Sequence, residues 1–235
     1  VSIQMPTHFQ ISLEGLEPHN DSIRGAGHFQ RTLAFLDQLQ AQEIFSMVML
    51  TLTRGNMNQV LPLAETLRDR TDFFTFNRLS TVGEGAQLLM ADPAEFQSFL
   101  KDYEKAAAAN PIMGLKDNLF NIHRFREEKE LFGGCTGHGC GAAFNFLALL
   151  PDGEVHACRK FPSPVGNIKK NRLIDIYQSE LSQKYRRGSS ACSDCELNIV
   201  CRGCLAIAYS NGLDIFKEKD PFCFFKPEKE SLDTL

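Results

Sequence analysis

Short apolar runs alternate with helix-like segments along the first half of the chain. Three runs rich in apolar and β-favouring residues predict strands at residues 9–13, 45–53 and 73–79. Between the first two runs, residues 27–42 carry apolar side chains three or four positions apart, which predicts a helix. After the second run, Asn56 is expected to cap another helix that ends near Arg70.

The order of these elements favours an α/β fold. Asp92, Pro93 and Glu95 form a helix start with an N-cap, a proline in the first turn and an acidic third residue, so a helix is expected over 93–109. Strands joined through helices by short connections pair in parallel with right-handed crossovers. Three strands alone would leave exposed edges. We therefore expect part of a larger barrel or open sheet whose earlier strands are absent from this sequence.

The second half changes character near Leu131. Residues 133–141 are too rich in glycine for a helix or a strand. Residues 143–150 and 154–158 flank a Pro-Asp-Gly turn, which predicts a β-hairpin, and a short helix is expected over 173–181. The remaining segments are short and separated by cysteines, so this half has little core of its own. Bound metal would supply much of its stability.

All eight cysteines fall in this second half, and their spacing is its strongest signal. Cys192, Cys195, Cys201 and Cys204 are separated by only two, five and two residues. Such short gaps let the backbone turn thiolates toward a common soft metal centre. Eight cysteines would fill two four-thiolate sites, and either two zinc ions or two iron–sulfur clusters would satisfy that count.

Composition limits the number of domains, the compartment and the kinds of partner. The 235 residues are 43% hydrophobic, enough for one large or two small domains. A net charge of −4 without a basic run gives no indication of nucleic-acid binding. No apolar stretch approaches the ~18 residues of a membrane span, and no secretory leader precedes the first strand. We therefore expect a cytoplasmic protein without membrane partners, in which disulfides are the less favoured use of the cysteines.

The cysteine pattern resembles the SPASM/twitch region of radical SAM enzymes. Twelve residues follow Cys140 before Gly153, and Gly153 to Cys158 matches the Gly-x4-Cys step of that pattern. The gaps from Cys192 through Cys201 also match, whereas two residues rather than three precede Cys204. The resemblance covers roughly residues 131–225 and ends on a closing cysteine, Cys223.

This resemblance implies two auxiliary [4Fe–4S] clusters. The first would take Cys135, Cys140, Cys158 and Cys204 as ligands, and the second Cys192, Cys195, Cys201 and Cys223. Zinc in the same eight thiolates is the alternative, because spacing alone does not exclude it.

The first half of the chain also resembles the family, but less specifically. Residues 9–15 and the loop after them resemble the fourth strand of the radical SAM partial barrel. The implied fold is the C-terminal portion of a partial (β/α) barrel over residues 1–130. A cysteine-rich α+β SPASM domain with a β-hairpin would follow over 131–235.

One family motif is missing from the sequence. The C-x3-C-x2-C motif that holds the SAM-cleaving cluster occurs nowhere in the 235 residues. In the family it follows the first barrel strand, so we expect a fragment that lacks its N-terminal part and is inactive alone. A non-catalytic relative is the alternative explanation.

Residues at strand ends are candidates for contact with S-adenosylmethionine, because ligands of parallel α/β folds gather there. The resemblance implies such contacts for Ser12, Glu14, Thr51 and Leu79. Ordinary packing or capping at a strand end is at least as good an explanation for each one singly. Arg24 could pair with a carboxylate or lie in a surface salt bridge.

Polar residues among the cysteines carry weaker signals. Arg159 follows Cys158, where sulfatase-maturing relatives have an aspartate that serves as a general base. Arginine does not accept a proton at neutral pH, which counts against formylglycine formation. His138 and His156 could be alternative ligands or proton carriers, although solvated loop histidines are commoner.

The function implied by the resemblance is that of a maturase for a ribosomally synthesised peptide. A 5′-deoxyadenosyl radical would abstract hydrogen from that precursor peptide, and residues 139–164 are most similar to maturases of cysteine- or selenocysteine-containing peptides. The expected partners are the precursor peptide, an external reductant such as flavodoxin or ferredoxin, and the missing N-terminal barrel segment. A non-catalytic electron-transfer or peptide-binding module is the alternative, and a zinc-stabilised scaffold comes third.

Overall fold

The computed structural model describes residues 6–226, which fall into two compact units. Unit 1 runs to Leu79 and resumes over 87–117, and unit 2 comprises 80–86 and the chain from Asn118 onward. The sequence places the boundary at 130/131 instead. The difference arises because residues 118–130 contain polar side chains that bind the backbone of the cysteine-bearing loops.

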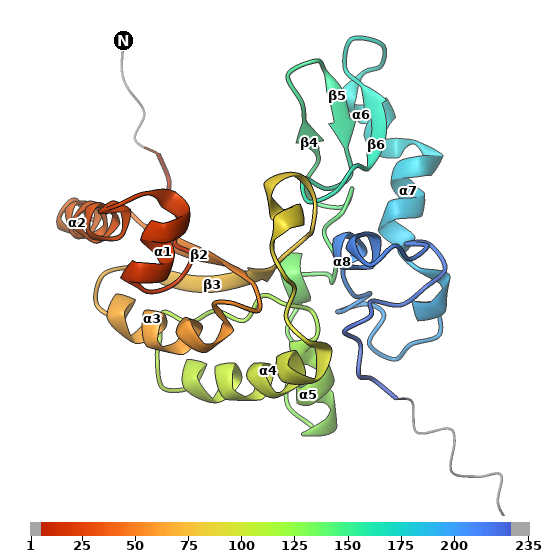
Figure 1. Ribbon diagram of the computed structural model, residues 1–235. Helices are drawn as coiled ribbons and strands as arrows, with labels where there is room; N and C mark the ends of the chain where they lie inside the picture. The colour runs from red at the N-terminus through yellow and green to blue at the C-terminus, as the bar shows by residue number, and fades with distance from the viewer. Residues whose placement is uncertain (1–5, 227–235) are drawn as a thin grey trace, which may run out of the picture. The chain divides into compact units, whose positions relative to one another are not determined.

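The sheet of unit 1 consists of three parallel strands in the order β1-β2-β3 (Figure 1). The strands are β1 (Phe9–Ser12), β2 (Ser46–Leu52) and β3 (Phe73–Arg78). All three fall in the apolar runs that predicted them. Residues 112–114 extend the sheet beyond β3, because Phe74 N–H donates to Ile112 O at 2.6 Å and Gly114 N–H to Phe74 O at 2.9 Å.

Four α-helices connect and cover these strands: α1 (Glu17–Arg24), α2 (His28–Ala41), α3 (Val60–Leu67) and α4 (Pro93–Ala107). The helices α2 and α4 were expected. Helix α1 was not, since it is strongly polar and only Asn20 in it is buried. Its register depends instead on side-chain bonds such as that from Glu14 N–H to Asn20 Oδ1 at 3.2 Å.

The expected role of Asn56 as a helix cap is wrong. Its buried side chain accepts from Thr53 N–H at 2.8 Å and donates to the carbonyls of Glu14 and Thr51, each at 2.9 Å. Asn56 therefore ties together the ends of β1 and β2. The chain after it forms a 3-10 turn, η1 (Met57–Gln59), and α3 ends at Leu67 rather than near residue 70.

Aromatic side chains form the core between β3 and α4. The Phe76 ring lies 6.2, 5.2 and 5.1 Å from the ring centroids of Phe96, Phe99 and Tyr103 respectively, in edge-to-face geometry. Burial raises the pKa of Tyr103, whose hydroxyl donates to Gly114 O at 3.2 Å. Unit 1 thus has a hydrophobic core that owes nothing to the cysteines.

Unit 2 contains an antiparallel sheet of β4 (Ala148–Leu149), β5 (Glu154–His156) and β6 (Pro164–Asn167). The turn between β4 and β5 has Gly153 at φ +91°, as expected of a Pro-Asp-Gly hairpin. The third strand was not foreseen. Proline and glycine within its four residues argue against a strand by propensity, but β6 is an edge strand, where both are tolerated.

Helices of unit 2 are short. They are α5 (Phe120–Arg126), α6 (Leu173–Gln178), α7 (Glu180–Arg187) and α8 (Leu205–Ser210), with 3-10 turns η2 (Gly83–Gln87), η3 (Gly134–Thr136) and η4 (Ser190–Cys192). The helix expected over 173–181 is interrupted at Ser179, whose side chain accepts from Ser182 N–H at 3.2 Å and caps α7. A small core joins β5 to α6 and α8 through Val155, Ile176 and Leu205.

Within residues 6–226, no helix is both long and apolar enough to cross a membrane.

We expect Asp92→Ala to destabilise unit 1 by about 1 kcal/mol, the usual cost of losing an N-cap. The Asp92 carboxylate accepts from Ala94 N–H at 2.8 Å and Glu95 N–H at 3.2 Å at the start of α4. Urea unfolding followed by circular dichroism would measure the loss. Asp102→Ala, at an exposed position within the same helix, is the control and should change stability by less than ~0.5 kcal/mol. Equal effects of the two substitutions would contradict the capping role.

Candidate metal centres and cofactor site

The first group of thiols comprises Cys135, Cys140, Cys158 and Cys204, and we name it thiol group I. They come from η3, the loop after it, the segment after β5, and the N-cap of α8. The pKa of the Cys140 thiol is raised to about 12, mainly by burial and in addition by the neighbouring Cys204, Cys158 and Cys135. Burial likewise raises the pKa of Cys158, with Cys204 adding to the shift.

The remaining thiols, Cys192, Cys195, Cys201 and Cys223, line one small hollow, and we name them thiol group II. Burial raises the pKa of Cys192 to about 11, with Cys223 and Cys195 contributing after it. The pKa of Cys223 is raised by burial, and Asp220 and Cys195 act in the same direction. The structure therefore gathers the eight thiols into two groups of four.

Backbone N–H groups point at several of these sulfurs. Lys160 N–H donates to Cys158 Sγ at 3.5 Å, and Gly203 N–H to Cys201 Sγ at 3.4 Å. Backbone N–H groups of Ala142 and Phe225 lower the pKa values of Cys140 and Cys223, against the larger effect of burial. Such donors favour the thiolate over the thiol, which is the form that binds metal.

A buried asparagine, Asn118, fixes the loops of both groups. Its Oδ1 accepts from Cys135 N–H at 2.6 Å, and its Nδ2 donates to the carbonyls of Cys201 and Gly203 at 2.7 and 2.8 Å. One side chain thus bonds to a residue of group I and a residue of group II. Sequence reasoning missed it, because a single asparagine 83 residues from Cys201 carries no local signal.

Asp220 makes a second link between the groups. Its Oδ2 accepts from Cys204 N–H at 2.9 Å, its Oδ1 from Phe222 N–H at 3.0 Å, and its carbonyl from Cys223 N–H at 2.9 Å. The carboxylate is buried and lies against Gly203, where an added Cβ would come within 2.6 Å of Asp220 Cβ. A larger residue at position 203 would displace Asp220 and the cysteines bonded to it.

The backbone conformation explains how only two residues, rather than three, can separate Cys201 from Cys204. Both residues between Cys201 and Cys204 have positive φ, +55° at Arg202 and +63° at Gly203. Two left-handed residues in succession reverse the chain, so that Cys204 leaves its sequence neighbours of group II. The Arg202 guanidinium holds this turn by donating to the carbonyls of Arg186 and His138.

The two histidines near the cysteines differ in whether their ring nitrogens are engaged. The His156 Nε2 lies 2.6 Å from Glu154 Oε1, and its Nδ1 accepts from Ser163 N–H at 3.0 Å, so both ring nitrogens have protein partners. The His138 ring packs against Phe144 with the ring centroids 5.3 Å apart. Among residues 6–226, no three His, Cys, Asp or Glu side chains are arranged to hold a single metal ion.

The four residues expected to contact S-adenosylmethionine all lie where strands of the parallel sheet end. Ser12 is the last residue of β1, Thr51 is the penultimate residue of β2, and Leu79 directly follows β3. Leu79 is buried and its N–H donates to Leu52 O at 3.0 Å. The strands run in parallel, so these positions share one edge of the sheet.

Glu14 differs from the other three, because its carboxylate is already engaged. Arg24 Nε and Nη2 donate to Glu14 Oε1 at 3.0 and 2.5 Å, and the Glu14 side chain is only 13% exposed. Both guanidinium nitrogens donate to the same carboxylate oxygen, and such charge-assisted bonds are stronger than those between neutral groups. A ligand would have to compete with Arg24 for this carboxylate.

Asp21 is a further residue that sequence reasoning did not single out. Its carboxylate accepts from Gly27 N–H at 2.5 Å and Phe29 N–H at 2.8 Å, at the start of α2. The Phe29 N–H is the main reason that its pKa is lowered. The signal was a carboxylate seven residues before the first residue of α2, which is too distant to be recognised as an N-cap from the sequence.

Comparison with known proteins finds a family model that matches part of unit 2 and relatives that are similar over most of the chain. Residues 140–204 match SPASM, described as an iron-sulfur cluster-binding domain. The AdoMet-dependent heme synthase of Methanosarcina barkeri is 25% identical over 94% of this chain and 68% of its own length. The mycofactocin maturase MftC of Mycobacterium ulcerans is 29% identical over 91% of this chain and 60% of its own.

A solved structure shares the fold. Streptococcus suis SuiB bound to S-adenosylmethionine superposes with a TM-score of 0.65 at 16% identity, over 92% of this chain and 53% of SuiB. The chain spans about half to two thirds of the length of these proteins. Residues 140–204 thus match an iron–sulfur cluster-binding domain, and the chain is similar to these proteins over most of its length and shares the fold of SuiB.

Proposed function

We propose that this chain is the cluster-binding part of a radical SAM enzyme that modifies a ribosomally synthesised peptide. The observation that carries the proposal is the gathering of eight thiols into two groups of four within and beside a SPASM domain. Residues 1–130 would form the later strands of the radical SAM barrel, and 131–235 the domain with the auxiliary clusters.

Thiol group I would bind one [4Fe–4S] cluster and thiol group II the other. The donor sets fit, because four cysteine thiolates are the usual ligands of such a cluster. When bound, these clusters supply one-electron transfer. The chain's own part is to hold the sulfurs in place through Asn118 and Asp220, and to stabilise thiolates by N–H bonds such as that from Gly203.

Contact with S-adenosylmethionine is proposed for the sheet edge of unit 1. Ser12 and Thr51 offer hydroxyl groups there, and Leu79 would contact the adenine through its backbone at the end of β3. The carboxylate of Glu14 would join the site by exchanging Arg24 for a cationic group of the ligand.

The substrate class follows from relatives and is proposed for this chain on that ground. MftC is named a maturase, and SuiB has also been solved bound to its precursor peptide SuiA. We therefore propose a precursor peptide, with cysteine- or selenocysteine-containing peptides as the narrower class. An external reductant such as flavodoxin or ferredoxin would supply electrons in a reducing cytoplasm, where free thiols persist.

A tetrapyrrole substrate is the second candidate, favoured by the likeness to an AdoMet-dependent heme synthase. Incubation of the intact enzyme with a candidate peptide or with a porphyrin, followed by mass spectrometry of each, would separate the two classes. Modification of the porphyrin alone would replace the peptide proposal.

The proposed clusters predict iron, not zinc. Anaerobically reconstituted protein should be brown and contain about eight irons per chain, four for each group of thiols. Metal analysis by plasma mass spectrometry and Mössbauer spectroscopy would check the count and the cluster type. About two zinc ions with negligible iron under these conditions would exclude the proposal.

Thiol group I takes cysteines from distant segments, so replacing one of them is expected to affect its cluster more than the cluster of thiol group II. Cys204→Ala should lose the cluster of thiol group I and loosen the β4–β5 hairpin, because Cys204 packs against the core that contains Val155. Part of the iron in thiol group II should remain. Iron content and limited proteolysis under anaerobic conditions would report both effects. Lys101→Ala, at an exposed position of α4, is the control. Full iron and native protease resistance in Cys204→Ala would show the ligand sets to be wrong.

The raised thiol pKa values predict how the metal-free chain responds to pH. An unfolded thiol ionises near ~8.5, whereas Cys140 and Cys192 stay protonated in the folded chain until about 12 and about 11. The unfolded state therefore loses these protons first, and the free energy of unfolding should fall as the pH rises above about 9. Urea unfolding of reduced, metal-free protein at several pH values would test this. Cys140→Ala should flatten the dependence, and a stability that rises over this range would be incompatible with the burial described.

A further inference from the structure

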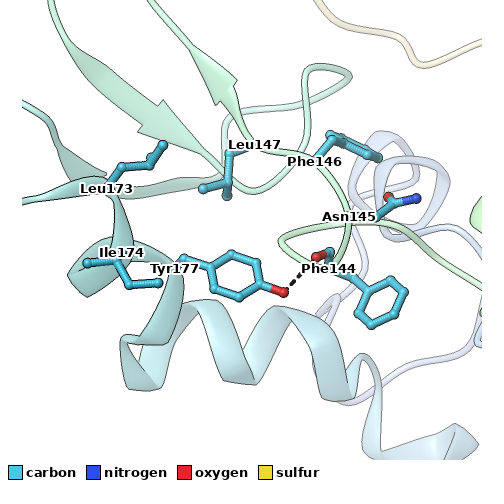
Figure 2. Close-up of a pocket in the computed structure, with 7 residues that line it drawn as sticks. All are labelled: Phe144, Asn145, Phe146, Leu147, Leu173, Ile174 and Tyr177. Carbon is cyan, nitrogen blue, oxygen red and sulfur yellow. Dashed lines mark hydrogen bonds between the residues drawn. The ribbon is translucent and has the colours of Figure 1, made fainter.

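An apolar groove lies beside the hairpin of unit 2, and none of the eight thiols lines it. Phe146 and Leu147, which precede β4, form one wall, and Leu173, Ile174 and Tyr177 of α6 form the other (Figure 2). Its volume is about 690 Å³, within the range of sites that bind ligands or peptide side chains.

The two walls are fixed to each other. The Tyr177 hydroxyl donates to Phe144 O at 2.8 Å, as the dashed line in Figure 2 marks. The Arg186 guanidinium lies over the Tyr177 ring, 4.2 Å from its centroid, and also donates to Tyr177 O. On the opposite side of α6, Ile176 is only 3% exposed and anchors the helix to the core. The groove is therefore preformed and not a gap between mobile segments.

Several exposed apolar side chains cluster around the groove. Leu173 and Ile174 are 56% and 48% exposed, and Leu149, two residues beyond Leu147, is 58% exposed. Scattered single apolar residues are ordinary on protein surfaces, whereas several gathered around one groove mark a binding site.

The charge around the groove opposes that of the whole chain. Residues 159–187, which include α6 and α7, contain eight Lys or Arg and two Asp or Glu, a net charge of +6 in a chain of net charge −4. Arg172 pairs with Asp175 at 2.8 Å. The exposed Lys169 and Lys170 form no ion pair with any other residue of the range 6–226. Two ammonium groups without an ion pair thus lie four and three residues before α6 begins at Leu173.

We propose that this groove binds an acidic, apolar segment of the peptide that the enzyme modifies. Leucine- or phenylalanine-sized side chains would enter the hollow between Leu147 and Leu173, and flanking carboxylates would pair with Lys169 and Lys170. The identity of the peptide as a substrate rests on the proposed function, whereas the groove and its charge do not. A second copy of this chain is a poor occupant, because a symmetric contact would set one basic face against another.

Binding can be measured without turnover. The probe is a fluorescein-labelled synthetic peptide in which Glu residues flank a Leu-Phe-Leu core, titrated with iron-loaded protein at low ionic strength and followed by fluorescence anisotropy. The double variant Leu173→Ser/Ile174→Ser should bind about tenfold more weakly or worse, as removal of apolar anchors does. Both side chains are largely exposed, so the fold should persist, and iron content would verify it. Leu89→Ser, at a 68% exposed leucine of unit 1, is the matched control and should bind normally.

The charged rim is tested separately. Lys169→Glu/Lys170→Glu should weaken binding about tenfold and reduce its salt dependence, because surface ion pairs are screened by salt. Lys101→Glu is the matched control. A Lys-flanked peptide with the same apolar core should bind at least about tenfold more weakly than the acidic one.

Several results would overturn this inference. The first two are unchanged affinity in both double variants, and equal affinity for the acidic and the Lys-flanked peptides. Concentration-dependent dimerisation that disappears in Leu173→Ser/Ile174→Ser would assign the groove to a second copy and overturn it as well. If the unsubstituted protein loads about eight irons but does not bind the acidic peptide, the groove inference fails and the proposed function stands. If the protein takes up zinc and negligible iron on reconstitution but still binds the acidic probe, the enzyme proposal fails and the groove inference stands.

Discussion

The structure of unit 2 depends on bringing eight thiols into two small groups against the cost of burying and crowding them. Burial and mutual proximity raise the pKa values of Cys140 and Cys192, so the chain without metal keeps these groups as neutral thiols. Binding metal converts them to thiolates, and the binding free energy then becomes folding free energy. The side chains of Asn118 and Asp220 reduce the cost by fixing loops from both groups.

The two units are stabilised in different ways. Unit 1 has a core of aromatic rings between β3 and α4, with Tyr103 fully buried, and its strands end at one edge where a ligand can gather. Unit 2 has only a small core around Val155 and Ile176 and relies on side-chain bonds to backbone, such as those of Asn121 to Phe132 and Val200. The same small unit still maintains a preformed apolar groove, because α6 is anchored through Ile176.

The parts of this fold that sequence predicted are those with local causes. Strands β1 to β3 lie in apolar runs, α4 begins at a recognisable Asp92 cap, and the hairpin turns at a glycine that needs positive φ. The grouping of the thiols followed from spacing and resemblance together. Contacts between distant residues left no local signal: Asn118 to Cys201 spans 83 residues, and Asn56 to Glu14 spans 42. Strand β6 was missed because Pro164 and Gly166 disfavour strands except at an edge.

Each group of four thiols is proposed to bind one iron–sulfur cluster. The most direct test is an anaerobic crystal structure of the reconstituted chain, with anomalous diffraction recorded on both sides of the iron absorption edge. Two separate iron peaks are expected, one bonded to Cys135, Cys140, Cys158 and Cys204, and the other to Cys192, Cys195, Cys201 and Cys223. Anomalous signal at the zinc edge only, or one peak bonded to cysteines of both groups, would contradict this proposal.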